Sequence, residues 1–169
     1  MVTQHGLWWV MLAYRVPREP STPRIAVWRK LRSLGVAQVG DGLVALPGGA
    51  RTREQLEWVA ADVDTAGGSA ILWRAEMLST RDEQHLIAQL QQARAEEYRA
   101  LIAEVQKQTR TGPDAEQARA LDRLRRELRR IRRRDYFPPP EQESDRHAVA
   151  AVAGRAGEPA SMSPTGGRA

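Results

Sequence analysis

The chain has 169 residues, enough for one domain of ordinary size with extensions, and it carries a net charge of +5. It contains no cysteine, which excludes disulfides and thiolate metal sites. The longest apolar run, residues 7–14, is far shorter than the roughly 20 residues that a membrane helix needs. Because this run also lacks the flanks of a secretory signal, we expect a cytoplasmic protein without a membrane partner.

The first predicted elements are a strand and a helix. Residues 7–16 (LWWVMLAYRV) are apolar and rich in aromatic and β-branched side chains, a pattern typical of a central strand covered on both faces. Ser21 and Thr22, followed by Pro23, predict the capped start of a helix, and Gly35 predicts its end. The side chains expected on the inner face of this helix are Ile25, Val27, Trp28, Leu31 and Leu34.

A hairpin and a second helix follow. Residues 36–39 and 43–46 are predicted to form the two strands of a hairpin, joined by a turn at residues 40–42. Thr52 and Gln55 have the spacing of a capping box, so they predict the start of the second helix. That helix would end at the glycine pair before the next strand.

A last strand at residues 70–77 completes the order βαββαβ. A right-handed crossover on each side of a hairpin gives the ferredoxin-like split unit. We therefore predict an α+β fold with a ferredoxin-like βαββαβ core over residues 1–79. Trp58 lies opposite the inner stripe of the second helix, so we expect either the following helices or another subunit to cover it, which makes it a candidate interface residue.

The remainder of the chain predicts two helices and a tail. Residues 80–109 have a long helical pattern, residues 111–114 break it, and a second helix runs to about residue 135. The short connection predicts an antiparallel helical hairpin over residues 80–137, packed on the core. Residues 138–169 contain too little apolar mass to fold, and they are predicted to form a disordered tail.

Nine arginines lie within residues 119–134, around apolar side chains spaced three, four and three apart (Leu121, Leu124, Leu128 and Ile131). This spacing predicts a helix that buries one stripe and exposes guanidinium groups, which suit the phosphates of DNA. The alternative is a solvated face, partly neutralised by the glutamates of the preceding helix. The candidate DNA- or anion-binding residues here are Arg123, Arg126, Arg130, Arg133 and Arg134.

The start of the first helix is a second candidate site. Ser21, Thr22 and Arg24 combine free amides with a cation, and we interpret them as an oxyanion pocket for DNA phosphate or chromate. The alternative is an ordinary cap, with Arg24 paired to Glu19 or Glu57. On the exposed side of the same helix, a third candidate site could extend the basic surface, or could consist of ordinary surface residues: Arg29, Lys30 and Arg32.

With these residues placed, the chain resembles the N-terminal domain of the ChrB family of chromate resistance proteins. The similarity spans about residues 7–137, and it rests on the order and spacing of several short stretches. The resembling stretches are residues 7–9, 20–31, 34–36, 41–47, 56–59, 66–68, 95–98 and 134–137. This resemblance implies a cytoplasmic, chromate-responsive transcriptional regulator whose N-terminal region contacts DNA and is usually followed by a larger C-terminal domain. We expect that second domain to be absent here, which leaves direct sensing of chromate open.

A wider resemblance connects the core to the ferredoxin-like domain of PaaX-type repressors and of small CRISPR-associated nucleases. The nucleases carry a metal-binding aspartate at the end of the first strand, where this chain has Ala13, Tyr14 and Arg15. The three histidines are far apart in the sequence, and no nucleophile or phosphate loop accompanies them. We therefore expect no enzymatic activity, no metal and no cofactor.

Two functions from different classes remain. The first is a chromate-resistance-type regulator that binds promoter DNA, works as a homodimer and takes chromate as an effector. The second is an interaction module that binds no DNA, in which the apolar stripe and Trp58 form an interface with a separately encoded partner protein. An enzyme is a distant third.

Overall fold

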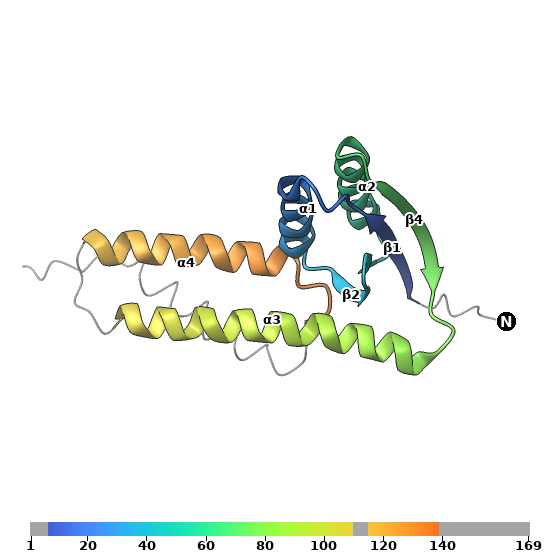
Figure 1. Ribbon diagram of the computed structural model, residues 1–169. Coiled ribbons are helices and arrows are strands. Elements are labelled where there is room, and N and C mark those ends of the chain that lie inside the picture. Colours follow the sequence, from blue (N-terminus) through green and yellow to red (C-terminus); the bar gives the residue numbers. More distant parts are fainter. Residues whose placement is uncertain (1–6, 110–114, 139–169) are drawn as a thin grey trace, which may run out of the picture. The chain divides into compact units, whose positions relative to one another are not determined.

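The computed structural model describes residues 7–109 and 115–138 (Figure 1). The break predicted at residues 111–114 and nearly all of the predicted tail lie outside the described residues. The elements, in chain order, are β1 (Trp8–Arg15), α1 (Ser21–Leu34), β2 (Ala37–Gly40), β3 (Leu43–Pro47), α2 (Ala50–Thr65), β4 (Ser69–Glu76), α3 (Thr80–Thr109) and α4 (Ala115–Arg133).

The four strands form one antiparallel sheet in the order β2-β3-β1-β4. The central strand β1 pairs with both β3 and β4, so that Met11 lies opposite Ala45 on one side and Trp73 on the other. This strand order and the helices after β1 and β3 are those of a ferredoxin-like fold, which confirms the predicted fold class.

Both faces of β1 are covered, as its continuous apolarity predicts. Val10 and Leu12 point to the face that carries α1 and α2, where they join a core with side chains from both helices. Trp9 points to the opposite face and packs with Leu86 and Leu90 from the first half of α3. The alternation of side chains along one strand therefore joins two separate apolar clusters through the sheet.

The described chain divides into two compact units, and the division falls inside α3. The core unit contains residues 7–93 together with residues 134–137. The Tyr136 hydroxyl donates a hydrogen bond of 3.0 Å to the carbonyl oxygen of Leu34. The centre of the Phe137 ring lies 5.9 Å from the centre of the Trp9 ring. The segment after α4 is thus part of the core unit, although it is far from that unit in the sequence.

The second unit, the helical hairpin unit, contains residues 94–133. Its helices run antiparallel, as predicted, and they share one apolar cluster (Figure 1). Tyr98 and Leu101 from α3 are buried there against Leu128 and Ile131 from α4. This cluster is small, because each helix contributes only one stripe of side chains.

Both predicted helix caps are wrong in detail. Pro20 occupies the N-cap position of α1, so Ser21 and Thr22 lie inside the helix and no side chain caps it. A capping side chain must come before the first helical residue, and proline offers no acceptor there. Thr52 likewise lies inside α2, where its hydroxyl donates to the carbonyl oxygens of Pro47 at 2.7 Å and Gly49 at 3.0 Å.

Candidate functional site

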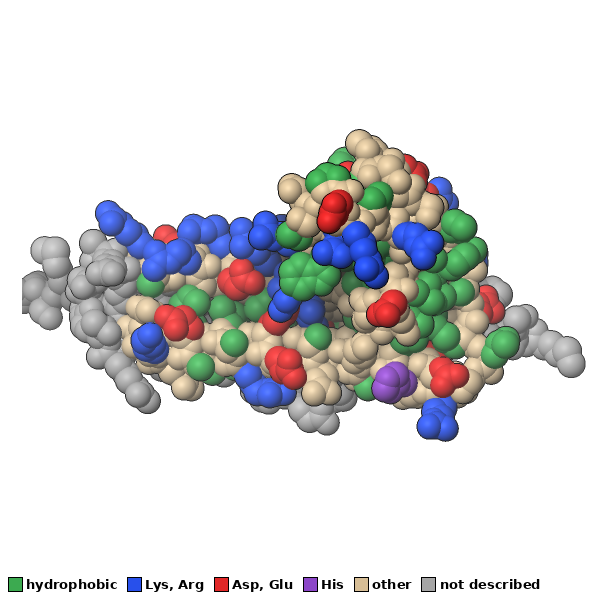
Figure 2. Space-filling model, in the orientation of Figure 1, with side chains coloured by type: hydrophobic (Ala, Val, Ile, Leu, Met, Phe, Trp, Pro, Cys, Tyr) green, Lys and Arg blue, Asp and Glu red, His purple; other side chains and the backbone are tan. Residues whose placement is uncertain are grey.

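Helix α4 separates its apolar and cationic side chains. Leu128 and Ile131 are buried and Leu124 is half-buried within the helical hairpin unit. Because four or three residues make about one turn, this spacing directs one stripe inward and leaves the rest of the circumference outside. Figure 2 shows Lys and Arg side chains gathered along α4. The exposed arginines are Arg119, Arg123, Arg126, Arg129, Arg130, Arg132 and Arg133.

Several of these side chains form a continuous arginine stripe, defined as Arg119, Arg126, Arg129, Arg130 and Arg133. Residues seven apart lie nearly above one another on a helix, at a separation of about 10 Å along its axis. Arg129 and Arg130, three and four positions after Arg126, lie on the same side of the helix between Arg126 and Arg133. The stripe therefore runs along most of α4 on the side opposite Leu128 and Ile131.

Acidic side chains neutralise little of this stripe. The described ion pairs of α4 are local, at i,i+3: Arg125 with Asp122 at 3.0 Å and Arg130 with Glu127 at 3.4 Å. Within the described residues, Arg119, Arg126, Arg129 and Arg133 form no ion pair. At these four arginines, the described residues form no ion pair that would support the alternative of a face neutralised by glutamates.

The other predicted arginines of this region differ from one another. Arg123 is exposed on the flank of α4, whereas Arg134 follows the end of the helix, is half-buried and belongs to the core unit. Sequence reasoning chose Arg123 and Arg134 but left out Arg119 and Arg129. Arg119 lies seven residues before Arg126, so counting back from Arg126 by this spacing would have found it.

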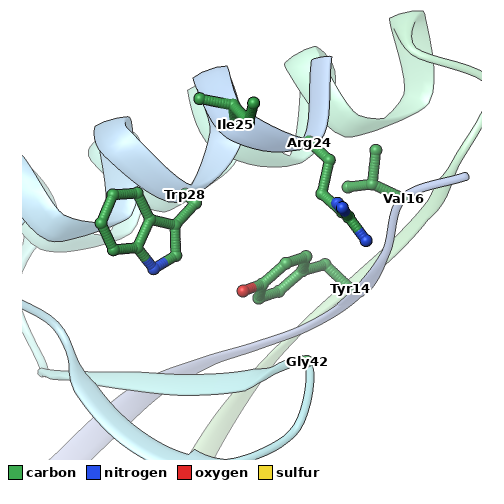
Figure 3. Close-up of a pocket in the computed structure, with 6 residues that line it drawn as sticks. All are labelled: Tyr14, Val16, Arg24, Ile25, Trp28 and Gly42. Atoms are coloured by element: carbon green, nitrogen blue, oxygen red, sulfur yellow. The ribbon is translucent and has the colours of Figure 1, made fainter. Parts of the chain in front are cut away.

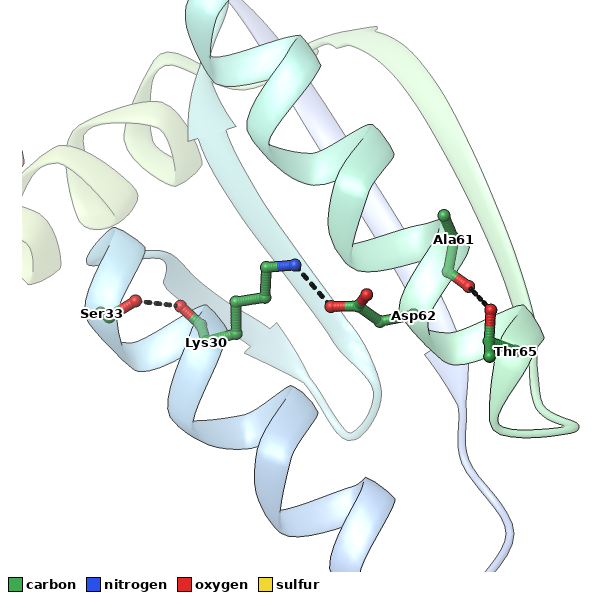
Figure 4. A network of polar contacts seen from close by, with 5 residues as sticks. All are labelled: Lys30, Ser33, Ala61, Asp62 and Thr65. Atoms are coloured by element: carbon green, nitrogen blue, oxygen red, sulfur yellow. Dashed lines mark hydrogen bonds and ion pairs between the residues drawn. The ribbon is translucent and has the colours of Figure 1, made fainter.

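The basic residues on the exposed side of α1 do not form one free cationic surface. Lys30 forms an ion pair with Asp62 of α2 (Figure 4). The guanidinium carbon of Arg32 lies 5.2 Å from the centre of the Trp28 ring, within the range of a cation–π contact. Arg29 is exposed. The charge of Lys30 is therefore already balanced within the core unit.

A cavity of about 320 Å³ lies at the start of α1 (Figure 3). Of the predicted oxyanion trio, only Arg24 lines it; Ser21 and Thr22 do not. The sequence pattern missed the other lining residues because it assigned them to the interior, to a strand or to a turn. These residues are Tyr14, Val16, Ile25, Trp28 and Gly42.

Two of the residues that line this cavity, Tyr14 of β1 and Gly42 of the β2–β3 turn, are hydrogen-bonded through their backbones. The backbone N–H of Tyr14 donates to the carbonyl oxygen of Gly42 at 2.7 Å. Gly42 has a φ of 69°, and a Cβ there would lie 2.4 Å from the Tyr14 carbonyl oxygen, so only glycine fits. Burial raises the pKa of the Tyr14 phenol above its ordinary value.

Trp58 is 63% exposed on α2, whereas Leu56, Val59 and Val63 of the same helix are buried. No side chain of the described core unit buries Trp58, and its covering by the helical hairpin or by another subunit stays a prediction. A tryptophan on this side of α2 adds nothing to the apolar interior, because the sheet takes up the opposite stripe of the helix. A second molecule that covers it remains a proposal.

The comparisons place the chain among known proteins. A family model described as "Protein ChrB, N-terminal" matches residues 24–161. The chain belongs to this family. It is also 29% identical over 133 residues to the protein ChrB of Cupriavidus metallidurans, a match that covers 77% of this chain and 40% of that relative. No solved structure matches the chain.

Membership of the ChrB N-terminal family relates the chain to chromate resistance, in agreement with the resemblance noted in the sequence. The matched region contains both α1 from Arg24 onward and the whole of α4. None of the helices within the described residues is long and apolar enough to cross a membrane. In the same part of the chain, no three His, Asp or Glu side chains converge as metal ligands.

Proposed function

We propose that this ChrB-family chain is a non-enzymatic, chromate-resistance-type regulator that binds promoter DNA through the arginine stripe of α4. The observation that carries the proposal is the orientation of α4. Its apolar side chains are buried against α3, so Arg119, Arg126 and Arg133 face solvent on the opposite side.

Guanidinium groups favour a polyanion as the partner. Each can hold two phosphate oxygens at once, and each phosphate neutralised releases counterions from DNA. The 19 residues of α4 extend about 28 Å, long enough to follow several successive phosphates. The same arrangement can position a helix on DNA without reading the sequence of bases, so selectivity for a promoter requires further contacts.

The test is fluorescence anisotropy with labelled DNA from upstream of the chain's own gene and with unrelated DNA, each at several salt concentrations. We expect tighter binding to the upstream DNA and a steep loss of affinity as salt rises. The variant R119Q/R126Q/R133Q should bind both DNAs much more weakly. Its slope of log affinity against log salt should be shallower by about 3, the number of phosphate contacts removed.

The matched control is R18Q/R51Q/R81Q, which removes the same charge from exposed arginines of the core unit. This control should retain the salt slope of the unaltered chain. Equal slopes for the two triple variants would show that net charge alone, and not the stripe, attracts DNA. Equal affinity for the two DNA sequences would contradict the regulator.

A second candidate function is the interaction module that binds no DNA. Its support is a set of exposed apolar side chains in the core unit: Trp58 on α2, and Ile71 and Trp73 on β4, which are 47–63% exposed. A second copy of the chain or a separately encoded protein would cover such side chains. Under this alternative, DNA binding would be weak and unselective in the experiment above, whereas chain association would persist at high salt.

A further inference from the structure

Two apolar side chains that line the cavity at the start of α1 are not buried in the core of the protein. Ile25 and Trp28 were expected in the core, yet they remain 42% and 52% exposed. Only Val27 and Leu31 of this helix are buried, because α1 also packs beside α2 and can turn only one narrow stripe to the sheet. Two large apolar side chains therefore border solvent at the same opening.

The polar groups of the cavity are few. Arg24 forms no ion pair with a described residue, and its expected partner Glu57 binds Arg53 instead, with an N–O distance of 2.7 Å. The Tyr14 hydroxyl has no hydrogen bond to any described residue. Figure 3 shows this hydroxyl and the indole nitrogen of Trp28 directed toward each other across the cavity, with the Arg24 guanidinium beside the Tyr14 ring.

This combination does not suit a tetrahedral dianion such as chromate or sulfate. Such an ion loses a large hydration energy on binding, and it needs donors on several sides in compensation. Here one cation and two neutral donors line a space whose other walls are hydrocarbon and indole. A ligand with one anionic end and a flat apolar body would satisfy both kinds of wall, as most small-molecule sites do.

We propose that this pocket binds a small aromatic carboxylate or a closely similar organic monoanion. Its carboxylate would accept hydrogen bonds from Arg24, and its ring would pack against Trp28 and Ile25 on the side to which the Tyr14 hydroxyl points. The pocket lies wholly in the core unit and uses none of the arginine stripe. The inference therefore goes beyond DNA binding and does not rest on it.

Benzoate is a suitable probe, and ¹H–¹⁵N correlation spectra of the full chain give a site-specific measurement. The five tryptophans give five indole signals, and W28F identifies that of Trp28 by its disappearance. We expect benzoate to shift the Trp28 indole signal in a saturable manner, whereas the indole signal of Trp58 stays in place. Sulfate at the same concentration and ionic strength should leave the Trp28 signal unchanged.

Substitution then tests the carboxylate contact. R24M should weaken benzoate binding about tenfold, the size of one charge-assisted hydrogen bond, whereas R29M on the exposed side of α1 should not. Arg24 and Arg29 are both exposed, so neither variant threatens folding, and unchanged backbone signals confirm this. No benzoate shift at Trp28, equal binding by R24M, or a comparable shift with sulfate would each overturn the proposal. All three readouts are independent of DNA.

Discussion

The core unit and the helical hairpin unit bury their apolar side chains in different ways. In the core unit, one sheet separates two clusters, and β1 contributes to both through Val10 and Leu12 on one face and Trp9 on the other. In the hairpin unit, two helices share one cluster of four buried side chains, with Leu124 and Ile102 at its margin.

This difference relates to what each unit can offer a partner. A two-helix unit has a high proportion of surface, so α4 can expose many arginines while it buries only a few apolar side chains. The core unit has a cavity with aromatic walls, lined by the cation Arg24, which forms no ion pair with any described residue. Under the two proposals, an extended polyanion binds the hairpin unit and a small aromatic carboxylate binds the core unit.

The largest expected effect is on the core unit. Leu12 is fully buried in the middle of β1, with neighbours from two helices and two strands. Leu12→Ala should lower the free energy of unfolding near the upper end of about 2–5 kcal/mol, because the surrounding sheet cannot collapse into the cavity. Urea denaturation followed by circular dichroism measures this. A loss below about 1 kcal/mol would mean that the sheet is not the stable part of the chain.

Ile131→Ala makes the corresponding change in the hairpin unit, where Ile131 is also buried. Two helices can approach each other more easily than a sheet can, so we expect a smaller loss, about 2 kcal/mol. Hydrogen exchange should show faster exchange in α4 and in the second half of α3, with protection retained in β1 and β3. Faster exchange throughout the chain would contradict the division into two units.

The smallest expected effect concerns Tyr14 and alkaline pH. Burial raises its pKa in the folded protein above the ordinary value near 10. The folded state therefore holds this proton more tightly than the unfolded chain does. The resulting stability is present below pH 10 and is lost as the pH rises through the raised pKa. Tyr14→Phe has no phenol to titrate at this position, so its unfolding free energy should fall less between pH 8 and pH 10.5.

Tyr98 and Tyr136 are present in both proteins, so their contributions cancel in that comparison. Urea denaturation at the two pH values gives the difference directly. Identical alkaline losses for the unaltered chain and for Tyr14→Phe would show that the Tyr14 phenol is as solvated in the folded protein as in the unfolded chain.

Much of the fold could be read from the sequence. The apolar run around Trp9, the glycine at position 35 and the alternating strands led directly to the ferredoxin-like order, because each is a local signal. The spacing of Leu128 and Ile131 also predicted which side of α4 is buried. Leu121 was predicted in the same stripe, and its side chain lies outside the described residues.

The sites were harder to predict. The sequence pattern located Arg24 but joined it to Ser21 and Thr22, its neighbours in the chain. The cavity joins it instead to Tyr14 and Gly42, which come from β1 and the β2–β3 turn. Lys30 appeared to be a free surface cation until its partner Asp62, 32 residues away, was known.

The sequence by itself determined the order of the elements and the cationic face of α4, since these depend on residues within a few helical turns or on one strand. It also determined the family, through the order and spacing of short stretches along most of the chain. Only the tertiary structure decided that Trp28 borders a cavity, that Trp58 is exposed and that Lys30 is paired. The physical reason is that a helix can turn only part of its apolar arc toward the sheet. The contacts between α1, α2 and β1 set which part that is, and these contacts join residues that are distant in the sequence.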